Sequence, residues 1–335
     1  MKLSKAAVKA DAELIVWPET MVQAILDSPV WPSLVSSEEC RALDKALREH
    51  SKGNAFVLVG AYGGSIQEDS NGDICLARYN SAFLYRPDGE QDGRRYNKIH
   101  LVPFGEVLPL RKTIPSFYQM LMKVKFIPYN FDYSLDYGTE YSVFEMTGNE
   151  GKPAKTYRFS VMICYEDTVP EIARRFAIGK QGTKRLDWLV NISNDGWFVR
   201  FENGKVLPST ELAQHAAICV FRAVENRLAV LRSVNTGISC LIDTVGRVKD
   251  GFMDGNLPGK AMARKGCSGW FVDAIPIDKR TTFFSKYGQW LDILCSVCLF
   301  LLIILLLSGR FVRNRTYKGS RKMQNKKSKI KDEKH

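Results

Sequence analysis

The stretch Phe159-Ser160-Val161-Met162-Ile163-Cys164-Tyr165-Glu166-Asp167 decides the fold class. A short run rich in Val and Ile, bounded by polar residues, is typical of a buried strand. Pro170 then begins a predicted helix, so Cys164 stands at a strand-to-helix turn, where α/β enzymes often present a nucleophile. Taken alone, the stretch leaves two interpretations of Cys164 open: a nucleophile, or a small buried apolar residue.

Strands and helices alternate along the chain on both sides of this stretch. Val- and Ile-rich runs separated by helical patterns indicate an α/β fold, and neighbouring strand pairs favour a mixed sheet or a sandwich. The predicted strands cover residues 13–17, 55–60, 79–85, 159–163, 186–192, 228–233 and 238–243. The predicted helices cover residues 6–12, 21–26, 37–50, 170–175 and 211–226, with a cap-like Ser36-Ser37-Glu38-Glu39 at the start of the third.

The net charge of +12 is concentrated at one end of the chain. Residues 309–335 contain eleven Lys or Arg against two acidic residues, which gives +9 and leaves +3 for the first 308 residues. A nearly neutral body removes the main argument for nucleic-acid binding. The eight cysteines show neither a zinc-like cluster nor a regular spacing, so we expect no metal site and no disulfide framework.

A membrane-spanning helix is predicted near the C-terminus. Residues 293–309 contain no charged side chain, and with Trp290 and Leu291 the segment reaches the ~20 residues that a span requires. Tyr287 and Trp290 suit an aromatic belt at its N-terminal end. Residues 1–11 are polar and do not resemble a signal peptide.

Three residues with useful chemistry follow predicted strands. Glu19 comes after the first strand, Lys98 after a predicted hairpin, and Cys164 after the central strand. A thiol needs a base, which a carboxylate in a dry cleft can supply, and an ammonium can stabilise the oxyanion of a tetrahedral intermediate.

In order and in local sequence, these residues resemble the Glu-Lys-Cys triad of the nitrilase (carbon–nitrogen hydrolase) superfamily. They lie in Val16-Trp17-Pro18-Glu19, Tyr96-Asn97-Lys98-Ile99-His100 and Ile163-Cys164-Tyr165-Glu166. Within the superfamily, the chain is most similar to the apolipoprotein N-acyltransferase family, through residues 100–106, 191–198, 214–215, 222–227 and 232–239 and through the predicted membrane helix.

The resemblance implies a nitrilase-like αββα sandwich and a role for each matched residue. Glu19 would be the general base, Lys98 the oxyanion stabiliser and Cys164 the nucleophile that carries the acyl group. Glu106 would be a second carboxylate beside the site, orienting Lys98 or sharing in proton transfer. The N–H of Tyr165 could join the oxyanion hole.

Two interpretations remain open for each of three further residues. Glu166 is structural or catalytic, and the aromatic residues Trp197 and Phe198 line the pocket or pack. His215, on a predicted helix with no second histidine nearby, is not expected to bind a metal.

The resemblance also implies a ping-pong reaction that needs no metal and no cofactor. An acyl chain would pass from a phospholipid to Cys164, and then to the α-amine of S-diacylglyceryl cysteine at the N-terminus of an apolipoprotein. Residues 107–142, which include Phe117 and Leu121, would form a lid that touches lipid, or alternatively a surface arm.

The resulting domain plan is a catalytic domain at 1–284, a membrane helix at 285–309 and a basic tail at 310–335. Such a tail favours the cytoplasm, which would place the catalytic domain on the periplasmic side of a bacterial inner membrane.

The family carries a bundle of membrane helices ahead of the catalytic domain and an additional first strand. We therefore expect this sequence to be the C-terminal part of a longer or split protein, with one sheet that lacks its first strand. For a split protein, a separate N-terminal membrane-domain chain would be the expected partner. The alternatives are a small-amide hydrolase that uses the same triad, and an inactive membrane-anchored scaffold.

Overall fold

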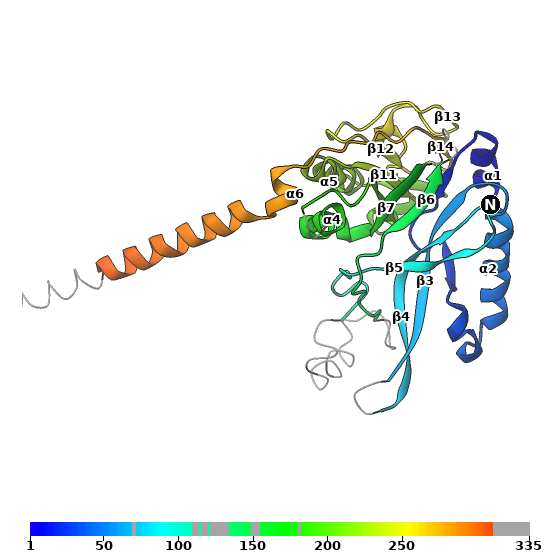
Figure 1. Ribbon diagram of the computed structural model, residues 1–335, viewed down its shortest axis with the longest axis horizontal. Helices are drawn as coiled ribbons and strands as arrows, with labels where there is room; N and C mark the ends of the chain where they lie inside the picture. The colour runs from blue at the N-terminus through cyan, green and yellow to red at the C-terminus, as the bar shows by residue number, and fades with distance from the viewer. Residues whose placement is uncertain are drawn as a thin grey trace, which may run out of the picture. The chain divides into compact units, whose positions relative to one another are not determined.

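The computed structural model describes residues 1–68, 72–108, 114, 120, 134–148, 155–179 and 182–310. The chain divides into two compact units, Met1–Lys286 and Tyr287–His335. Figure 1 shows the strands and most of the helices in the first unit.

The first sheet has five strands in the order β1-β3-β4-β5, and β2 also pairs with β3. In β3, Val57 and Val59 belong to a core cluster that includes side chains of helix α2, whereas Leu58 belongs to the cluster shared with the second sheet. This alternation of faces, with a period of two residues, is what a strand buried on both sides requires. The elements are β1 (Leu14–Val16), β2 (Val22–Ile25), β3 (Phe56–Glu68), β4 (Ile74–Tyr85), β5 (Gln91–Asn97), α1 (Lys2–Lys9), α2 (Ser37–Ser51) and the 3-10 helix η1 (Ser28–Ser33).

The second sheet has five strands in the order β12-β11-β8-β7-β6. Its three central strands, β7, β8 and β11, are parallel, so their carboxyl ends lie at one edge of the sheet. The elements are β6 (Phe144–Gly148), β7 (Lys155–Ile163), β8 (Trp188–Ser193), β11 (Ala229–Val234), β12 (Cys240–Ile242), α4 (Pro170–Ala177) and α5 (Glu211–Asn226). Shorter elements are η2 (Cys164–Thr168), η3 (Asp195–Phe198), η4 (Ala261–Ala263), the hairpin β9 (Val199–Glu202) and β10 (Lys205–Pro208), the pair β13 (Asp254–Gly255) and β14 (Phe271–Val272), and α6 (Phe283–Tyr287).

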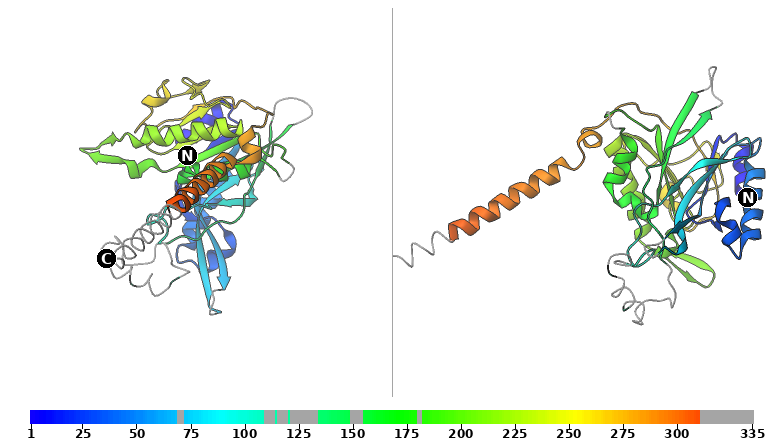
Figure 2. Two further views of the ribbon diagram at one scale, coloured as in Figure 1. Left: turned by 90° about the vertical axis from the view of Figure 1, so that its left-hand side faces the viewer. Right: turned by 60° about the horizontal axis from the view of Figure 1, so that its bottom comes forward.

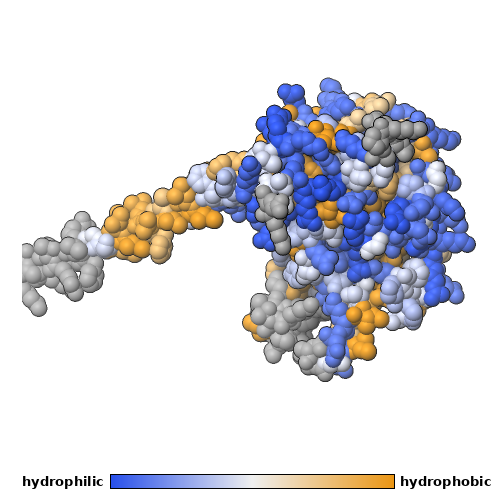
Figure 3. Space-filling view, in the orientation of Figure 1, coloured by the Kyte–Doolittle hydropathy of each residue, from blue (hydrophilic) through white to orange (hydrophobic). Residues whose placement is uncertain are grey.

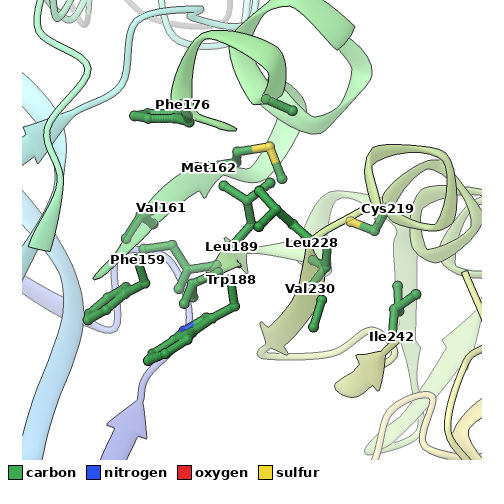
Figure 4. Packing of buried hydrophobic residues seen from close by; sticks show 14 of the residues in the cluster. Phe159, Val161, Met162, Phe176, Trp188, Leu189, Cys219, Leu228, Val230 and Ile242 are labelled. Atoms are coloured by element: carbon green, nitrogen blue, oxygen red, sulfur yellow. The ribbon is translucent and has the colours of Figure 1, made fainter. Parts of the chain in front are cut away.

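The core of the second sheet is built from large side chains of neighbouring strands (Figure 4). The rings of Phe159 and Trp188 stack with centroids 5.4 Å apart and an interplanar angle of 6°. Met162, Leu189 and Cys219 belong to the same cluster, and all three are fully buried. Each fully buried side chain of this size contributes roughly 1.5–3 kcal/mol to folding, so this cluster fixes β7 and β8 firmly.

The layers follow the order helix, sheet, sheet, helix (Figures 1 and 2). Helix α2 covers the outer face of the first sheet, and α4 and α5 cover the outer face of the second. The αββα sandwich predicted from the sequence is confirmed. Among the described residues, β1 pairs with β3 along one side and with no strand along the other, so it lies at an edge of the first sheet. The predicted absence of a first strand stays a prediction.

Two local predictions are wrong. Residues 21–26 were expected to be helical, but they contain strand β2, whose side chains alternate between buried and more exposed positions beside β3. Six residues are too few to establish a helical period, so strand pairing decides the conformation. Ser36 precedes α2 without capping it through its side chain, and its Oγ instead lies 3.9 Å from Cys40 Sγ.

The second unit contains the helix Trp290–Arg310, which is 21 residues long and apolar enough to cross a membrane. Its surface is largely apolar, as Figure 3 shows. All but residue 310 of the predicted basic tail lies outside the described residues, as do Phe117, Leu121 and most of the predicted lid.

Candidate active site

The ends of strands from both sheets supply the candidate site. In the first sheet β1, β3 and β5 run in the same direction, and Glu19 and Lys98 come after the carboxyl ends of β1 and β5. In the second sheet Ile163 pairs with Ile192, which places Cys164 and Ser193 at neighbouring strand ends. Functional side chains gather at such an edge because the strands fix the backbone just before each of them.

Glu19 is buried, with 5% of its surface exposed. Its segment lies directly against β3, because a Cβ at Gly60 would come within 2.6 Å of Pro18 O and 2.7 Å of the Glu19 Cα atom. Glycine at position 60 therefore permits the close approach that brings the carboxylate into the site. Glu19 Oε2 accepts a hydrogen bond of 2.7 Å from the N–H of Asn194, at the end of β8.

Lys98 is 1% exposed and lies between two carboxylates. Its Nζ is 3.3 Å from Glu19 Oε1 and 2.8 Å from Glu106 Oε2. Burial acts to lower the pKa of Lys98, but the negative charges of Glu19 and Glu106 outweigh it and raise the pKa above its usual value. The ammonium is therefore charged at every pH at which the protein would function.

Asn80, in the middle of β4, links the same two carboxylates. Its Nδ2 donates 2.6 Å to Glu19 Oε1 and 2.7 Å to Glu106 Oε1, and it is 2% exposed. The second Glu106 oxygen accepts 2.8 Å from the N–H of Val102, within the loop that carries Glu106. The sequence analysis missed Asn80, because a single polar residue in a predicted strand carries no recognisable motif.

Cys164 begins η2 immediately after β7, with a φ of +50°. This left-handed conformation is costly for a residue with a Cβ, and such strain is common at functional sites. Burial raises the pKa of the Cys164 thiol to about 12, and the charge of Glu19 adds to the increase while Lys98 and Ser193 oppose it. The thiol is therefore neutral at physiological pH.

Glu166 ties the Cys164 turn to the segment that follows Lys98. Its fully buried carboxylate accepts hydrogen bonds from the N–H groups of Ile163, Ile99 and His100 and from the hydroxyl of Tyr96, at 2.7–3.1 Å. Burial raises its pKa to about 7, although the hydrogen bonds lower it in part. Of the two interpretations from the sequence, these contacts support the structural one, since Glu166 fixes the backbone beside both Lys98 and Cys164.

Residues 1–253 match the family model described as carbon-nitrogen hydrolase. The chain belongs to the carbon-nitrogen hydrolase family.

Sequence relatives within this family are apolipoprotein N-acyltransferases. Those of Geobacter metallireducens, Bdellovibrio bacteriovorus and Treponema pallidum are 31%, 28% and 32% identical to the chain. The matches cover 73%, 87% and 72% of this chain and 38%, 46% and 39% of the relatives. The chain therefore spans less than half the length of these relatives.

An amidase from a Nesterenkonia species has a similar solved structure. The TM-score is 0.51 at 15% sequence identity, and the match covers 86% of this chain and 87% of the amidase. This likeness shows the carbon-nitrogen hydrolase fold and does not bear on the substrate.

The remaining predicted residues of this carbon-nitrogen hydrolase lie around the site. Tyr165 is 39% exposed, and its ring stacks on His100 with centroids 5.6 Å apart. Trp197 is 73% exposed, so of its two interpretations packing in the core does not fit, and lining the pocket stays a prediction. Phe198 lies edge-on to the buried ring of His215, with centroids 6.1 Å apart.

Proposed function

We propose that this chain carries the catalytic site of an acyltransferase that moves a fatty acyl chain from a phospholipid to the N-terminal amine of an apolipoprotein. The observation that carries the proposal is the buried group of Glu19, Lys98 and Glu106 at the strand ends, of which Glu19 and Lys98 lie close enough to Cys164 to act on the pKa of its thiol. The apolipoprotein N-acyltransferases among the relatives, together with the apolar helix Trp290–Arg310, support a lipid substrate over a small soluble amide.

In the first half-reaction, Cys164 Sγ attacks the carbonyl carbon of a phospholipid ester. Because the resting thiol is neutral, its proton passes to Glu19 as the S–C bond forms. The oxyanion of the tetrahedral intermediate is stabilised by the ammonium of Lys98 and by the N–H of Tyr165. The intermediate collapses with cleavage of the ester C–O bond, and the alkoxide of the lysophospholipid takes the proton from Glu19.

In the second half-reaction, the α-amine of S-diacylglyceryl cysteine attacks the thioester carbonyl. Glu19 takes a proton from the amine, the C–S bond breaks, and the Cys164 thiolate recovers that proton. Glu106 and Asn80 do not contact the reacting atoms in this scheme. They hold Lys98 and Glu19 in place through the hydrogen bonds that converge on the two carboxylates.

We propose that the chain is anchored in a bacterial cell membrane by Trp290–Arg310, with the catalytic unit on the periplasmic side and the basic tail in the cytoplasm. A separate chain with a bundle of membrane helices is a further proposed partner, since the relatives are more than twice as long as the matched region. The residues of the predicted lid, among them Phe117 and Leu121, are proposed to touch the lipid.

The test is acyl transfer in detergent–phospholipid micelles to a synthetic peptide with an N-terminal S-diacylglyceryl cysteine. Mass spectrometry of the peptide is expected to show N-acylation by the chain, alone or co-expressed with a membrane-domain chain, and none by Cys164→Ala. Ammonia release from small amides without peptide acylation would support the hydrolase alternative and contradict the proposal.

A further inference from the structure

A buried ionic cluster connects helix α5 with the turn η2, which begins at Cys164. Its members are drawn from η2, η3, α5 and β11, and their side chains are at most 9% exposed. The cluster consists of Asp167, Asp195, His215 and Arg232. The proposed reaction uses none of these residues.

The ring of His215 is held at both nitrogens by carboxylates. Nδ1 lies 2.9 Å from Asp195 Oδ1, and Nε2 lies 3.0 Å from Asp167 Oδ2. A neutral imidazole has one N–H and one lone pair, and a lone pair that faced a carboxylate oxygen at this distance would be repelled. Both nitrogens therefore carry protons, and the ring is an imidazolium. The hydrogen bonds to the two carboxylates outweigh burial and raise the pKa of His215 to about 9.

The imidazolium joins the two loops that carry the site. Asp167 belongs to η2, the turn that begins with Cys164. Asp195 begins η3, accepts 2.7 Å from Ser193 Oγ, and follows Asn194, whose N–H holds Glu19. His215 thus bridges the nucleophile turn and the loop that orients the proposed base.

The charges of the cluster balance. The groups that face the ring are Asp167 from η2, Asp195 from η3, Arg232 from β11 and, on α5 itself, Cys219, which donates to Asp167 at 3.1 Å. Arg232 lies 2.9 Å from Asp195 and 3.4 Å from Asp167. Two carboxylates face two cations, so loss of the imidazolium charge leaves one uncompensated negative charge close to Cys164. A buried negative charge disfavours a second one nearby, and Asp167 already raises the pKa of the Cys164 thiol.

We propose that His215 is a positioning residue for Cys164. The positive charge of His215 keeps the cluster neutral and so favours ionisation of the Cys164 thiol. This inference rests on the proposed function for its biological meaning, because it assigns Cys164 as the nucleophile. The chemistry itself is a property of the thiol and can be measured without any acyl donor.

The experiment follows alkylation of Cys164 by iodoacetamide in the detergent-solubilised full chain, by mass spectrometry of the peptide that contains it. At pH 8, His215→Gln is expected to alkylate about tenfold more slowly than wild type, which corresponds to a rise of about one unit in the pKa of the thiol. The double variant His215→Gln/Asp195→Asn removes one carboxylate together with the cation, and we expect it to recover to within about threefold of the wild-type rate.

Asp44→Asn provides the matched control. Asp44 is buried in α2, in the other helical layer, and its carboxylate is paired with Arg48 at 2.6 Å. Its replacement breaks a partly buried ion pair without adding charge near Cys164, and the alkylation rate is expected to stay within about twofold of wild type. Urea unfolding of each variant shows that the folded protein is being compared.

A purely structural role for His215 predicts a different pattern. The double variant would then be as slow as His215→Gln or slower, and this result, or a wild-type rate in His215→Gln, would overturn the proposal. The wild-type pH profile is decisive even if the variants fail to fold. The logarithm of the alkylation rate should rise with unit slope below pH 8 and more shallowly above pH 9, where the imidazolium loses its proton, whereas unit slope up to pH 10 contradicts the proposal. If the alkylation rate rises more shallowly above pH 9, as predicted, but the chain transfers no acyl group, the result counts against the proposed function alone.

Discussion

The ammonium of Lys98 lies 3.3 Å from the carboxylate of Glu19, and both side chains are almost completely buried. The two groups interact strongly, because little water is present to screen an ion pair at a buried position. The buried Lys98 ammonium thus has a carboxylate partner, while burial raises the pKa of the Cys164 thiol and keeps it neutral. In the proposed reaction, proton transfer to Glu19 accompanies bond formation at Cys164.

Replacing Lys98 with Met should disable the site and destabilise the fold. Glu19 and Glu106 would face each other without the cation that both contact, which costs about 3–5 kcal/mol in the free energy of unfolding. Loss of the oxyanion partner should slow acylation of Cys164 by about 10²–10³. The double variant Lys98→Met/Glu106→Gln should regain part of the stability and none of the rate. An acylation rate within tenfold of wild type in Lys98→Met would contradict this assignment.

Asn80→Ala tests whether the link between the two carboxylates matters. The variant loses two hydrogen bonds to charged groups, of 2.6 and 2.7 Å, each worth about 1.5–3 kcal/mol. We expect lower stability in urea unfolding and acylation at least about tenfold slower, because Glu19 is held less firmly. Gln67→Ala, close to the tip of the β3–β4 hairpin, serves as the control. It should change neither the stability nor the acylation rate appreciably. Equal behaviour of the two variants would rule out the role given to Asn80.

Stability should depend on pH through His215. The pKa of His215 in the folded protein is about 9, above the usual value of 6.5. Its protonation therefore contributes fully to the free energy of unfolding below about pH 6.5, and this contribution is lost as the pH rises through 9. The corresponding free energy is about 3 kcal/mol. In urea unfolding between pH 6 and 10, wild type should lose this amount relative to His215→Gln. A constant difference between the two proteins across that range would show that the ring is not protonated in the fold.

The order of strands and helices could be predicted from the sequence because local patterns determine it. The runs around Val161 and Val190 are buried on both faces, and the predicted helix 211–226 agrees with the bounds of α5. Glu19, Lys98 and Cys164 could be selected because each follows a strand within a recognisable motif. Their roles in catalysis remain predictions.

Contacts between residues far apart in the chain could not be predicted. Asp167 and Cys219 are 52 residues apart, and Asn80 and Glu19 are 61 apart, so no local period connects them. The strand at Val22–Ile25 forms because β3 pairs with it, which is a tertiary effect that overrides a short helical pattern. Trp197, in the turn η3, is exposed although a large aromatic residue type suggests burial.

Charged residues placed within Trp290–Arg310 should prevent membrane anchoring. Leu301→Asp and Leu302→Lys together cost about 5–7 kcal/mol for insertion at the centre of a span. The variant should be released from membranes by alkaline carbonate, whereas wild type should stay in the pellet. Val35→Asp, on an exposed side chain of the catalytic unit, is the control and should remain bound. Release of wild type under the same conditions would contradict the proposed anchor.

The central claim is that Cys164 carries an acyl group, and intact-protein mass spectrometry tests it most directly. Membranes that contain the full chain are incubated with a phospholipid of known acyl composition, in parallel with Cys164→Ala. The account predicts a mass increase of one fatty acyl group that hydroxylamine removes and that the variant lacks. An increase of the same size in Cys164→Ala, or no increase even when a membrane-domain chain is co-expressed, would contradict it.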